Sequence, residues 1–329
     1  MQRCLEKGTL AHAYLLVGPP HIGKMTLALN MAQGLNCEAA GRPCLKCPSC
    51  QKIASGGHAD VQVIGLAQKE EAENKFIGID QIKQVQHSAS LPPFEGKHKV
   101  FIIDGAEQMS VEAANCLLKT LEEPVGSVTF ILLTVNDRLL PSTVVSRCQR
   151  LELTPLPAAG LTEALVGRGI EPERARLLAG LSHGCPGWAL LAAADDSLLR
   201  QHNEELDRTY DIIVAGCEER FAYASRLAGQ FSQNRKLVYG ALDLWLDYWR
   251  DLMLVKLGCR DTVTNIDRVE KLVEMSGGYR LAQIKGFIDS IRAAAEQLRL
   301  NVNPRLALEV LMLDIPVSEE EEEMVVKHG

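Results

Sequence analysis

A glycine-rich loop near the start of the chain constrains the fold more than any other feature of the sequence. The segment Gly18–Lys24 follows an apolar run and precedes a helical pattern, Met25–Gln33. A strand, a glycine-rich turn and a helix in this order are typical of a phosphate-binding loop, because backbone N–H groups at the helix N-terminus close around phosphate oxygens. The pattern predicts an α/β domain in which Gly18, Gly23 and Lys24 form a phosphate site.

The first half of the chain alternates apolar runs with helical patterns, which indicates parallel strands joined by crossover helices. Five strands are predicted, at Ala13–Val17, Asp60–Ile64, Lys99–Ile103, Val128–Leu133 and Gln149–Leu153. Gly34 is expected to end the helix after the loop. Another helix is predicted over Ser110–Glu123, with Ser110 as its N-cap and Pro124 as its stop. Its apolar stripe would consist of Val111, Ala114, Leu118 and Leu121.

Helical patterns replace the strands after residue 154, and Pro155 and Pro157 mark the boundary. Two longer helices carry apolar residues at helical spacing, and their stripes begin at Leu237 and Leu281. Trp245 and Trp249 lie four residues apart on one of them and are expected to be core residues. We therefore predict an α/β domain at 1–155, a small helical domain at 156–198, an all-helical domain at 199–317 and an acidic tail at 318–329.

Charge and hydropathy narrow the class of protein. The net charge of −7 owes five acids to the run Glu319–Glu323, so the body of the chain is close to neutral. A near-neutral body argues against autonomous binding to duplex DNA through a broad basic face. The uncharged stretch Leu177–Ala194 is interrupted by the turn-forming segment Ser182–Gly187, so two short helices are expected there and no membrane span.

Two groups that make phosphoryl transfer fast are missing beside the phosphate loop. Met25 follows the loop lysine, where a hydroxyl normally ligates Mg²⁺, and Thr26 comes one position late. Asp104 ends an apolar strand and suits a metal held through water. Gly105 follows it, where an acid usually polarises the attacking water, and Glu107 is more simply a surface acid than a substitute. A nucleotide fold without efficient hydrolysis is predicted.

Four of the ten cysteines, Cys37, Cys44, Cys47 and Cys50, fall within fourteen residues. The chain begins without an apolar leader, so a reducing, cytoplasmic compartment is expected and the cluster indicates a metal site rather than disulfides. Four thiolates without a neighbouring histidine suit Zn²⁺ or an iron–sulfur centre, and zinc is favoured. A redox pair and a chance cluster are the alternatives.

Together these motifs resemble the clamp-loader branch of the AAA+ ATPases, found in bacterial DNA polymerase III. The resemblance covers nearly the whole chain. It rests on Leu10–Tyr14 before the loop, the four-cysteine insertion, Asn115–Pro124, Ser146–Cys148 and Asn301–Leu306. It implies a RecA-like AAA+ parallel-sheet domain with a zinc-binding insertion, followed by a helical lid and an all-α collar domain.

Departures from the ATPase members, gamma/tau, indicate which branch of the family the chain resembles. At the place where gamma/tau carry a lid arginine that senses the γ-phosphate, this chain reads Gly184–Leu190 without arginine, similar to the delta-prime branch. With Met25 and Gly105, this implies a subunit that does not hydrolyse ATP efficiently. Whether ATP and Mg²⁺ bind its own site, which would include Thr26 and Asp104, stays open.

Arg147 retains the family's Ser-Arg-Cys motif, so the resemblance implies an arginine finger that acts in trans on a neighbouring subunit's nucleotide. A local ion pair is the alternative role. The implied partners are gamma/tau and delta in a hetero-pentamer, with the sliding clamp and primer–template DNA reached through the assembly. Polymerase (nucleotidyltransferase) activity would belong to the holoenzyme. The rival hypotheses are an active gamma/tau-type ATPase and a zinc-dependent nucleic-acid-binding module.

Overall fold

The structure, a computed structural model, describes residues 11–39, 41–66, 76–123, 127–300 and 302–318. Four features with a predicted role lie outside these residues, namely Leu10, Pro124, Asn301 and the run Glu319–Glu323. Contacts divide the chain into two compact units, Met1–Leu156 with Cys185–Gly187 and Pro157–Gly184 with Trp188–Gly329. The finer division of the second unit into lid and collar stays a prediction.

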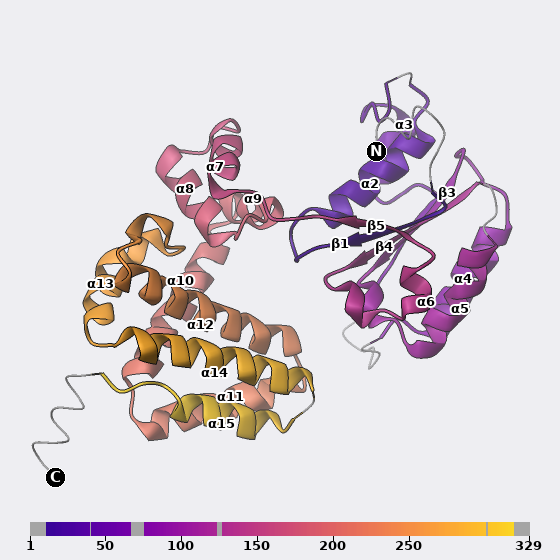
Figure 1. Cartoon of the computed structure of the whole chain (residues 1–329). Coiled ribbons are helices and arrows are strands. Elements are labelled where there is room, and N and C mark those ends of the chain that lie inside the picture. Colours follow the sequence, from indigo (N-terminus) through magenta and orange to yellow (C-terminus); the bar gives the residue numbers. More distant parts are fainter. Residues whose placement is uncertain (1–10, 40, 67–75, 124–126, 301, 319–329) are drawn as a thin grey trace, which may run out of the picture. The chain divides into compact units, whose positions relative to one another are not determined.

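The first unit is built on a parallel five-stranded sheet (Figure 1) with the strand order β2-β3-β4-β1-β5. The strands are β1 Ala13–Val17, β2 Val61–Ile64, β3 Lys99–Asp104, β4 Val128–Thr134 and β5 Gln149–Glu152. All five predicted strands are present, each within one residue of its expected bounds. The order, in which β1 lies between β4 and β5, is that of the RecA-like AAA+ fold.

Helices cover both faces of this sheet, which explains why its strands are continuous apolar runs. Alternate strand residues point to opposite faces. Leu15 and Phe101 pack with α4 (Ile79–Ser90) and α5 (Val111–Glu122) on one face, whereas Leu16 and Ile102 pack with α2 (Lys24–Asn36) and α3 (Pro48–Ala54) on the other. The helices of this unit are α2 Lys24–Asn36, α3 Pro48–Ala54, α4 Ile79–Ser90, α5 Val111–Glu122 and α6 Ser142–Val145, with 3₁₀ turns at Ala106–Gln108 and Asp137–Leu139. The α/β AAA+ class is confirmed.

Two local predictions in this unit are wrong. Helix α2 does not end at Gly34 but continues to Asn36, because Gly34 is buried in the packed face of the helix and tertiary contacts override its low helix propensity. In α5 the hydroxyl of Ser110 accepts a hydrogen bond from the N–H of Ala113, as an N-cap should. Val111, however, is 70% exposed. The buried residues of α5 are Ala113, Ala114, Leu117 and Leu121, so Ala114 and Leu121 of the predicted stripe are confirmed and Val111 is not part of it.

The second unit is entirely helical among the residues that the structure describes. Its helices are α7 Ala158–Val166, α8 Pro172–Leu181, α9 Pro186–Ala194, α10 Asp196–Val214, α11 Cys217–Phe231, α12 Arg235–Lys256, α13 Val269–Gly277, α14 Leu281–Arg299 and α15 Pro304–Leu313, with 3₁₀ turns at Arg260–Thr262 and Ile266–Arg268. A small apolar cluster joins α7, α8 and α9. A larger one joins α10 to α15 and contains Trp245 and Trp249, so the core assignment of both tryptophans is confirmed.

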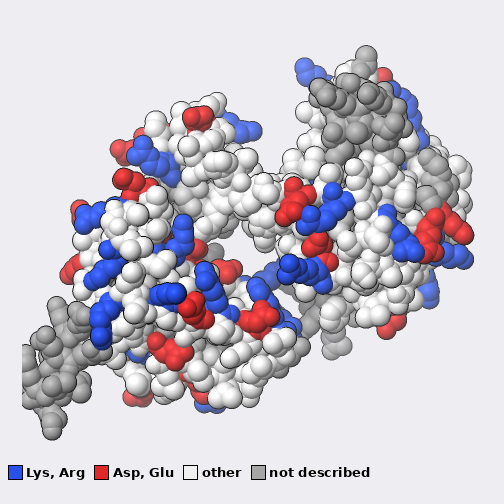
Figure 2. Space-filling view, in the orientation of Figure 1, with Lys and Arg blue, Asp and Glu red and all other residues white. Residues whose placement is uncertain are grey.

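Helices α8 and α9 confirm the two short helices expected around Ser182–Gly187. Leu237 and Leu281, the first members of the two predicted stripes, are exposed because each lies on the first turns of its helix, away from the packed face. Among the described residues, no helix is both long enough and apolar enough to cross a membrane. On the face drawn in Figure 2, acidic and basic side chains are interspersed over both units.

Candidate functional site

The phosphate loop connects β1 to α2 in a conformation that depends on two glycines. Gly18 lies so close to β5 that an added Cβ would stand 2.7 Å from the carbonyl oxygen of Leu153, nearer than such atoms approach. Gly23 immediately precedes α2 with a φ of 103°, a left-handed value that favours glycine. Both predicted loop glycines are therefore required by the backbone.

Lys24 is turned back over this loop. Its Nζ donates hydrogen bonds to the carbonyl oxygens of Gly18 at 2.6 Å and of Pro19 at 2.8 Å. Burial lowers the pKa of Lys24, and the nearby carboxylates of Glu107 and Asp104 oppose that shift. Lysine, loop and both acids therefore form one electrostatic cluster at the carboxyl end of the sheet.

The positions next to Lys24 offer no hydroxyl for a metal ion. Met25 packs against the apolar cluster that contains Leu16, and Thr26 is exposed to solvent. Helix α2 therefore carries an apolar side chain where a Mg²⁺ ligand is needed for hydrolysis.

Gly105 follows β3 with a φ of 72°, and an added Cβ would stand 2.9 Å from Oε1 of Gln108. A glutamate at this position would be strained in this backbone. Glu107 occupies the 3₁₀ turn that follows, and its Oε2 atom is buried without a hydrogen-bond partner in the described part of the chain. Glu107 thus lies closer to the cluster than the sequence indicated.

A turn from the second half of the chain packs on the phosphate loop. The backbone N–H of Gly187 donates to the carbonyl oxygen of His21 at 2.8 Å, and an added Cβ on Gly187 would stand 2.5 Å from that oxygen. His21 itself has a left-handed φ of 58°. Because His21 and Gly187 lie far apart in the sequence, no local pattern predicts this contact.

The four clustered cysteines lie together in space. Their Sγ atoms are all within 4.8 Å of one another, and Cys37 and Cys50 are fully buried. Sulfur atoms around a tetrahedral Zn²⁺ ion are separated by about 3.8 Å, since each Zn–S bond is about 2.3 Å long. The sulfurs are thus close enough to surround one metal ion after small side-chain adjustments.

The backbone supports thiolates in this cluster. The N–H of Cys44 donates to Sγ of Cys37 at 3.4 Å, and that of Cys47 donates to Sγ of Cys44 at 3.3 Å. Backbone N–H groups of Lys46 and Cys47 lower the pKa of the Cys44 thiol to about 6, while burial raises the pKa of Cys50 to about 12. N–H donors to the sulfurs are what a thiolate metal site uses around its ligands.

Buried polar side chains hold the cysteine module to α2, and hold the loop before β3 to α2 and to the start of β2. Gln33 donates through Nε2 to the carbonyl oxygen of Cys50 at 2.9 Å. Oδ1 of Asn36 accepts the backbone N–H groups of residues 97 and 98, and the buried carboxylate of Asp60 accepts those of residues 94, 95 and 96. Sequence reasoning missed Asn36 and Asp60, because their partners lie far along the chain.

Arg147 lies beyond the end of the short helix α6 and faces solvent in part. Its Nη2 is 2.5 Å from Oε1 of Glu122, and its Nη1 donates to the carbonyl oxygen of Thr143 at 2.9 Å. The side chains of Arg147 and Glu122 are 34% and 50% exposed. The structure therefore gives Arg147 the local ion pair that was the alternative to an arginine finger, in a place where another anion can still reach it.

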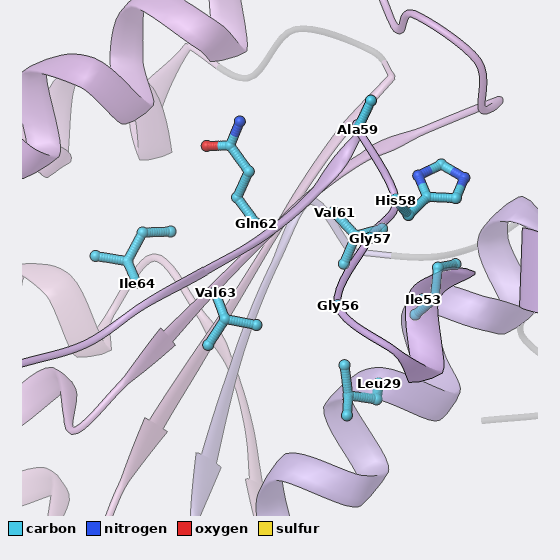
Figure 3. Close-up of a pocket in the computed structure, with 10 residues that line it drawn as sticks. All are labelled: Leu29, Ile53, Gly56, Gly57, His58, Ala59, Val61, Gln62, Val63 and Ile64. Atoms are coloured by element: carbon cyan, nitrogen blue, oxygen red, sulfur yellow. The ribbon is translucent and has the colours of Figure 1, made fainter. Parts of the chain in front are cut away.

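A hollow of about 560 Å³ lies along the outer edge of β2 and contains none of the predicted site residues. Leu29 and Ile53, from α2 and α3, lie on its helical side, and Gln62 and Ile64 lie across the strand (Figure 3). The hollow is therefore separate from the phosphate loop and from the cysteine cluster.

Comparison with known proteins identifies relatives of both branches. A family model described as "DNA polymerase III, delta subunit" matches residues 1–157. DNA polymerase III subunit delta' of Bacillus subtilis is 28% identical over 310 residues, which cover 94% of this chain and 92% of that protein. Subunit delta' of Pseudomonas aeruginosa is 41% identical over 182 residues, or 54% of each chain. Subunit tau of Bacillus subtilis is 26% identical over 348 residues, which cover 96% of this chain but 59% of tau.

Proposed function

We propose that this chain acts as a delta-prime-like scaffold. The premise is that it belongs to the family of DNA polymerase III clamp-loader subunits, which includes delta-prime and gamma/tau. In this role it hydrolyses little ATP itself and supplies Arg147 in trans to a neighbouring ATPase subunit. The choice of branch is supported by the share of each relative that is aligned, which is 92% of the Bacillus subtilis delta' subunit but 59% of tau.

The observation that carries the proposal is the pairing of a defective phosphate site with an accessible arginine. Lys24 binds its own loop carbonyls, Met25 faces the core and Gly105 has a backbone that disfavours glutamate. Fast phosphoryl transfer needs a positioned metal ion and a positioned water, and these three positions provide neither. Gly18, Gly23, Thr26 and Asp104 would then belong to a vestigial nucleotide site.

Arg147 suits a role in trans because its guanidinium is partly exposed and its ion pair with Glu122 is a surface one. Surface ion pairs contribute roughly 0–1 kcal/mol, so the pair with Glu122 does not prevent the arginine from binding a phosphate group as well. A guanidinium stabilises the charge that spreads over a transferred phosphoryl group, whichever subunit holds the nucleotide.

Zinc is the metal we assign to Cys37, Cys44, Cys47 and Cys50. Four sulfur ligands without an open position suit a structural Zn²⁺ rather than a catalytic metal. When bound, the ion would hold the module between α2 and α3 in shape, and no chemical step is assigned to it.

The partners we propose follow from the family. They are gamma/tau and delta subunits in a hetero-pentamer, which would act on the sliding clamp and on primer–template DNA in the cytoplasm. In this assembly the collar domain would hold the ring of subunits together, and the intact ATPase subunits would supply the energy.

ATP turnover by the purified chain tests the non-hydrolysing role. The proposal predicts turnover at the background level and no further loss in Lys24→Ala. Turnover comparable to that of the gamma/tau subunit, abolished by Lys24→Ala, would contradict it.

One observation favours the alternative of an active gamma/tau-type ATPase. The carboxylate of Glu107 influences Lys24 more than Asp104 does, and its Oε2 has no partner among the described residues. A free carboxylate in this place could polarise water. Under the alternative, Glu107→Gln abolishes turnover by the isolated chain, and under our proposal it changes nothing.

A further inference from the structure

Helix α5 ends in two acids, Glu122 and Glu123, although the C-terminus of a helix disfavours negative charge. Exposed carbonyl groups there carry a partial negative charge, so neither acid stabilises the helix through its dipole. The two differ in their contacts. Glu122 pairs with Arg147, whereas Glu123 has no ion pair in the part of the chain that the structure describes.

The guanidinium of Arg147 is held at three points. Nη1 donates to the carbonyl oxygen of Thr143 at 2.9 Å and to Oγ of Ser146 at 3.3 Å, and Nη2 contacts Oε1 of Glu122 at 2.5 Å. A guanidinium has five N–H donors. Two of them therefore have no acceptor among the described residues and are available to a second anion.

We propose that Glu122 is a positioning residue for Arg147. It holds the guanidinium so that the remaining donors meet the phosphate group of the neighbouring subunit's nucleotide. This inference rests on the proposed role of Arg147 in trans. It adds to that role the residue that orients the arginine before the neighbour's nucleotide arrives.

Three features of the contact support positioning over simple helix stabilisation. The carboxylate lies at a helix end that disfavours it, as described above. The long side chain of Arg147 would lose much rotamer freedom on binding a phosphate group. The contacts with Thr143 and Glu122 already restrict that freedom before the phosphate group is bound. The pair is half-exposed, so its loss does not leave a buried charge in the fold.

The test is the ATPase activity of the clamp loader reconstituted with gamma/tau-type and delta-type subunits of the same organism. Glu122→Gln keeps the size of the side chain and removes its charge, and Glu123→Gln is the matched control one residue away. We expect Glu122→Gln to remove about half or more of the activity that Arg147→Ala removes, and Glu123→Gln less than about a tenth. The KM for ATP should stay within about twofold, because the arginine acts in the transition state.

A double substitution separates positioning from a structural role. If Glu122 acts through Arg147, adding Glu122→Gln to Arg147→Ala causes no further loss. An equal further loss, or full activity in Glu122→Gln alone, overturns the inference while leaving the role of Arg147 intact. Full activity in Arg147→Ala instead refutes the proposed function, and the inference with it.

Discussion

Asp60 offers a direct test of how the loop before β3 is held against the start of β2. Its carboxylate is almost fully buried. Oδ1 accepts the N–H of Phe94 at 2.7 Å, and Oδ2 accepts those of Glu95 at 2.8 Å and Gly96 at 2.7 Å. In Asp60→Asn one oxygen can still serve two N–H groups, but the amide NH₂ faces the third donor.

The cost of this change follows from the three bonds. Leaving one buried N–H without an acceptor costs roughly 1–3 kcal/mol. The two remaining hydrogen bonds are no longer made to a charged oxygen. Each loses about half of its strength, or roughly 1 kcal/mol in total. We therefore expect the free energy of unfolding of the first unit to fall by about 3 kcal/mol at pH 7.

Urea denaturation followed by circular dichroism measures this loss. Trp188, Trp245 and Trp249 all lie in the second unit, so their fluorescence reports that unit separately and should keep its midpoint. Hydrogen exchange at the amides of residues 94–96 should accelerate. A loss below about 0.5 kcal/mol would refute the reasoning, since that is the size of an ordinary surface effect.

The pH dependence of the same variant gives a second check. Burial is the largest single influence on Asp60 and raises its pKa, but the N–H donors of Phe94, Gly96 and Glu95 together lower it below the ordinary value. A depressed carboxyl pKa contributes stability above the unfolded pKa of about 4, and that contribution disappears as the pH falls through the folded pKa. The difference in the free energy of unfolding between the native chain and Asp60→Asn should therefore be constant from neutral pH to about pH 5 and should decrease in stronger acid. A gap that persists unchanged at pH 2 would contradict this account.

Three further predictions concern the metal, the pair between His183 and Asp247, and the phosphate loop. The native chain should carry about one zinc per chain by elemental analysis and Cys47→Ser much less, whereas iron with visible absorbance would refute the assignment. The hydrogen bond between His183 and Asp247, at 2.9 Å, raises the pKa of His183. The contribution of this pair to stability is therefore complete below the ordinary histidine pKa and is lost as the pH rises through the raised value. NMR titration of His183 should show a lower pKa in Asp247→Asn, and an unchanged pKa would exclude the pair. Gly187→Ala brings a Cβ within 2.5 Å of a loop carbonyl and should accelerate hydrogen exchange in the phosphate loop, whereas Gly160→Ala, with open space around it, should not.

The sheet and the phosphate loop could be predicted because their signals are local. A strand covered on both faces must be apolar throughout. The short runs that contain Leu15 and Phe101 have this composition, so they can be recognised without knowing the rest of the fold. Gly18 and Gly23 mark backbone positions that other residues fill poorly. The cysteine cluster could be predicted because the spacing alone confines the four residues to one short segment of the chain.

Contacts between distant parts of the chain left no such signal. The bond from Gly187 to His21 and the pair between Arg147 and Glu122 depend on how the chain folds back, not on any local pattern. Helix α2 continues through Gly34 because packing outweighs local propensity. Sequence patterns therefore pointed to the candidate site residues but not to the partners that hold them.

The most direct test of the central claim is the ATPase activity of the reconstituted clamp loader with Arg147→Ala in this chain. The account predicts that folding and assembly are preserved, since Arg147 is a partly exposed residue in a surface ion pair. It also predicts that ATPase activity at saturating DNA and clamp falls, because one neighbouring site loses its arginine. Unchanged activity under these conditions would contradict the claim that this chain completes its neighbour's site.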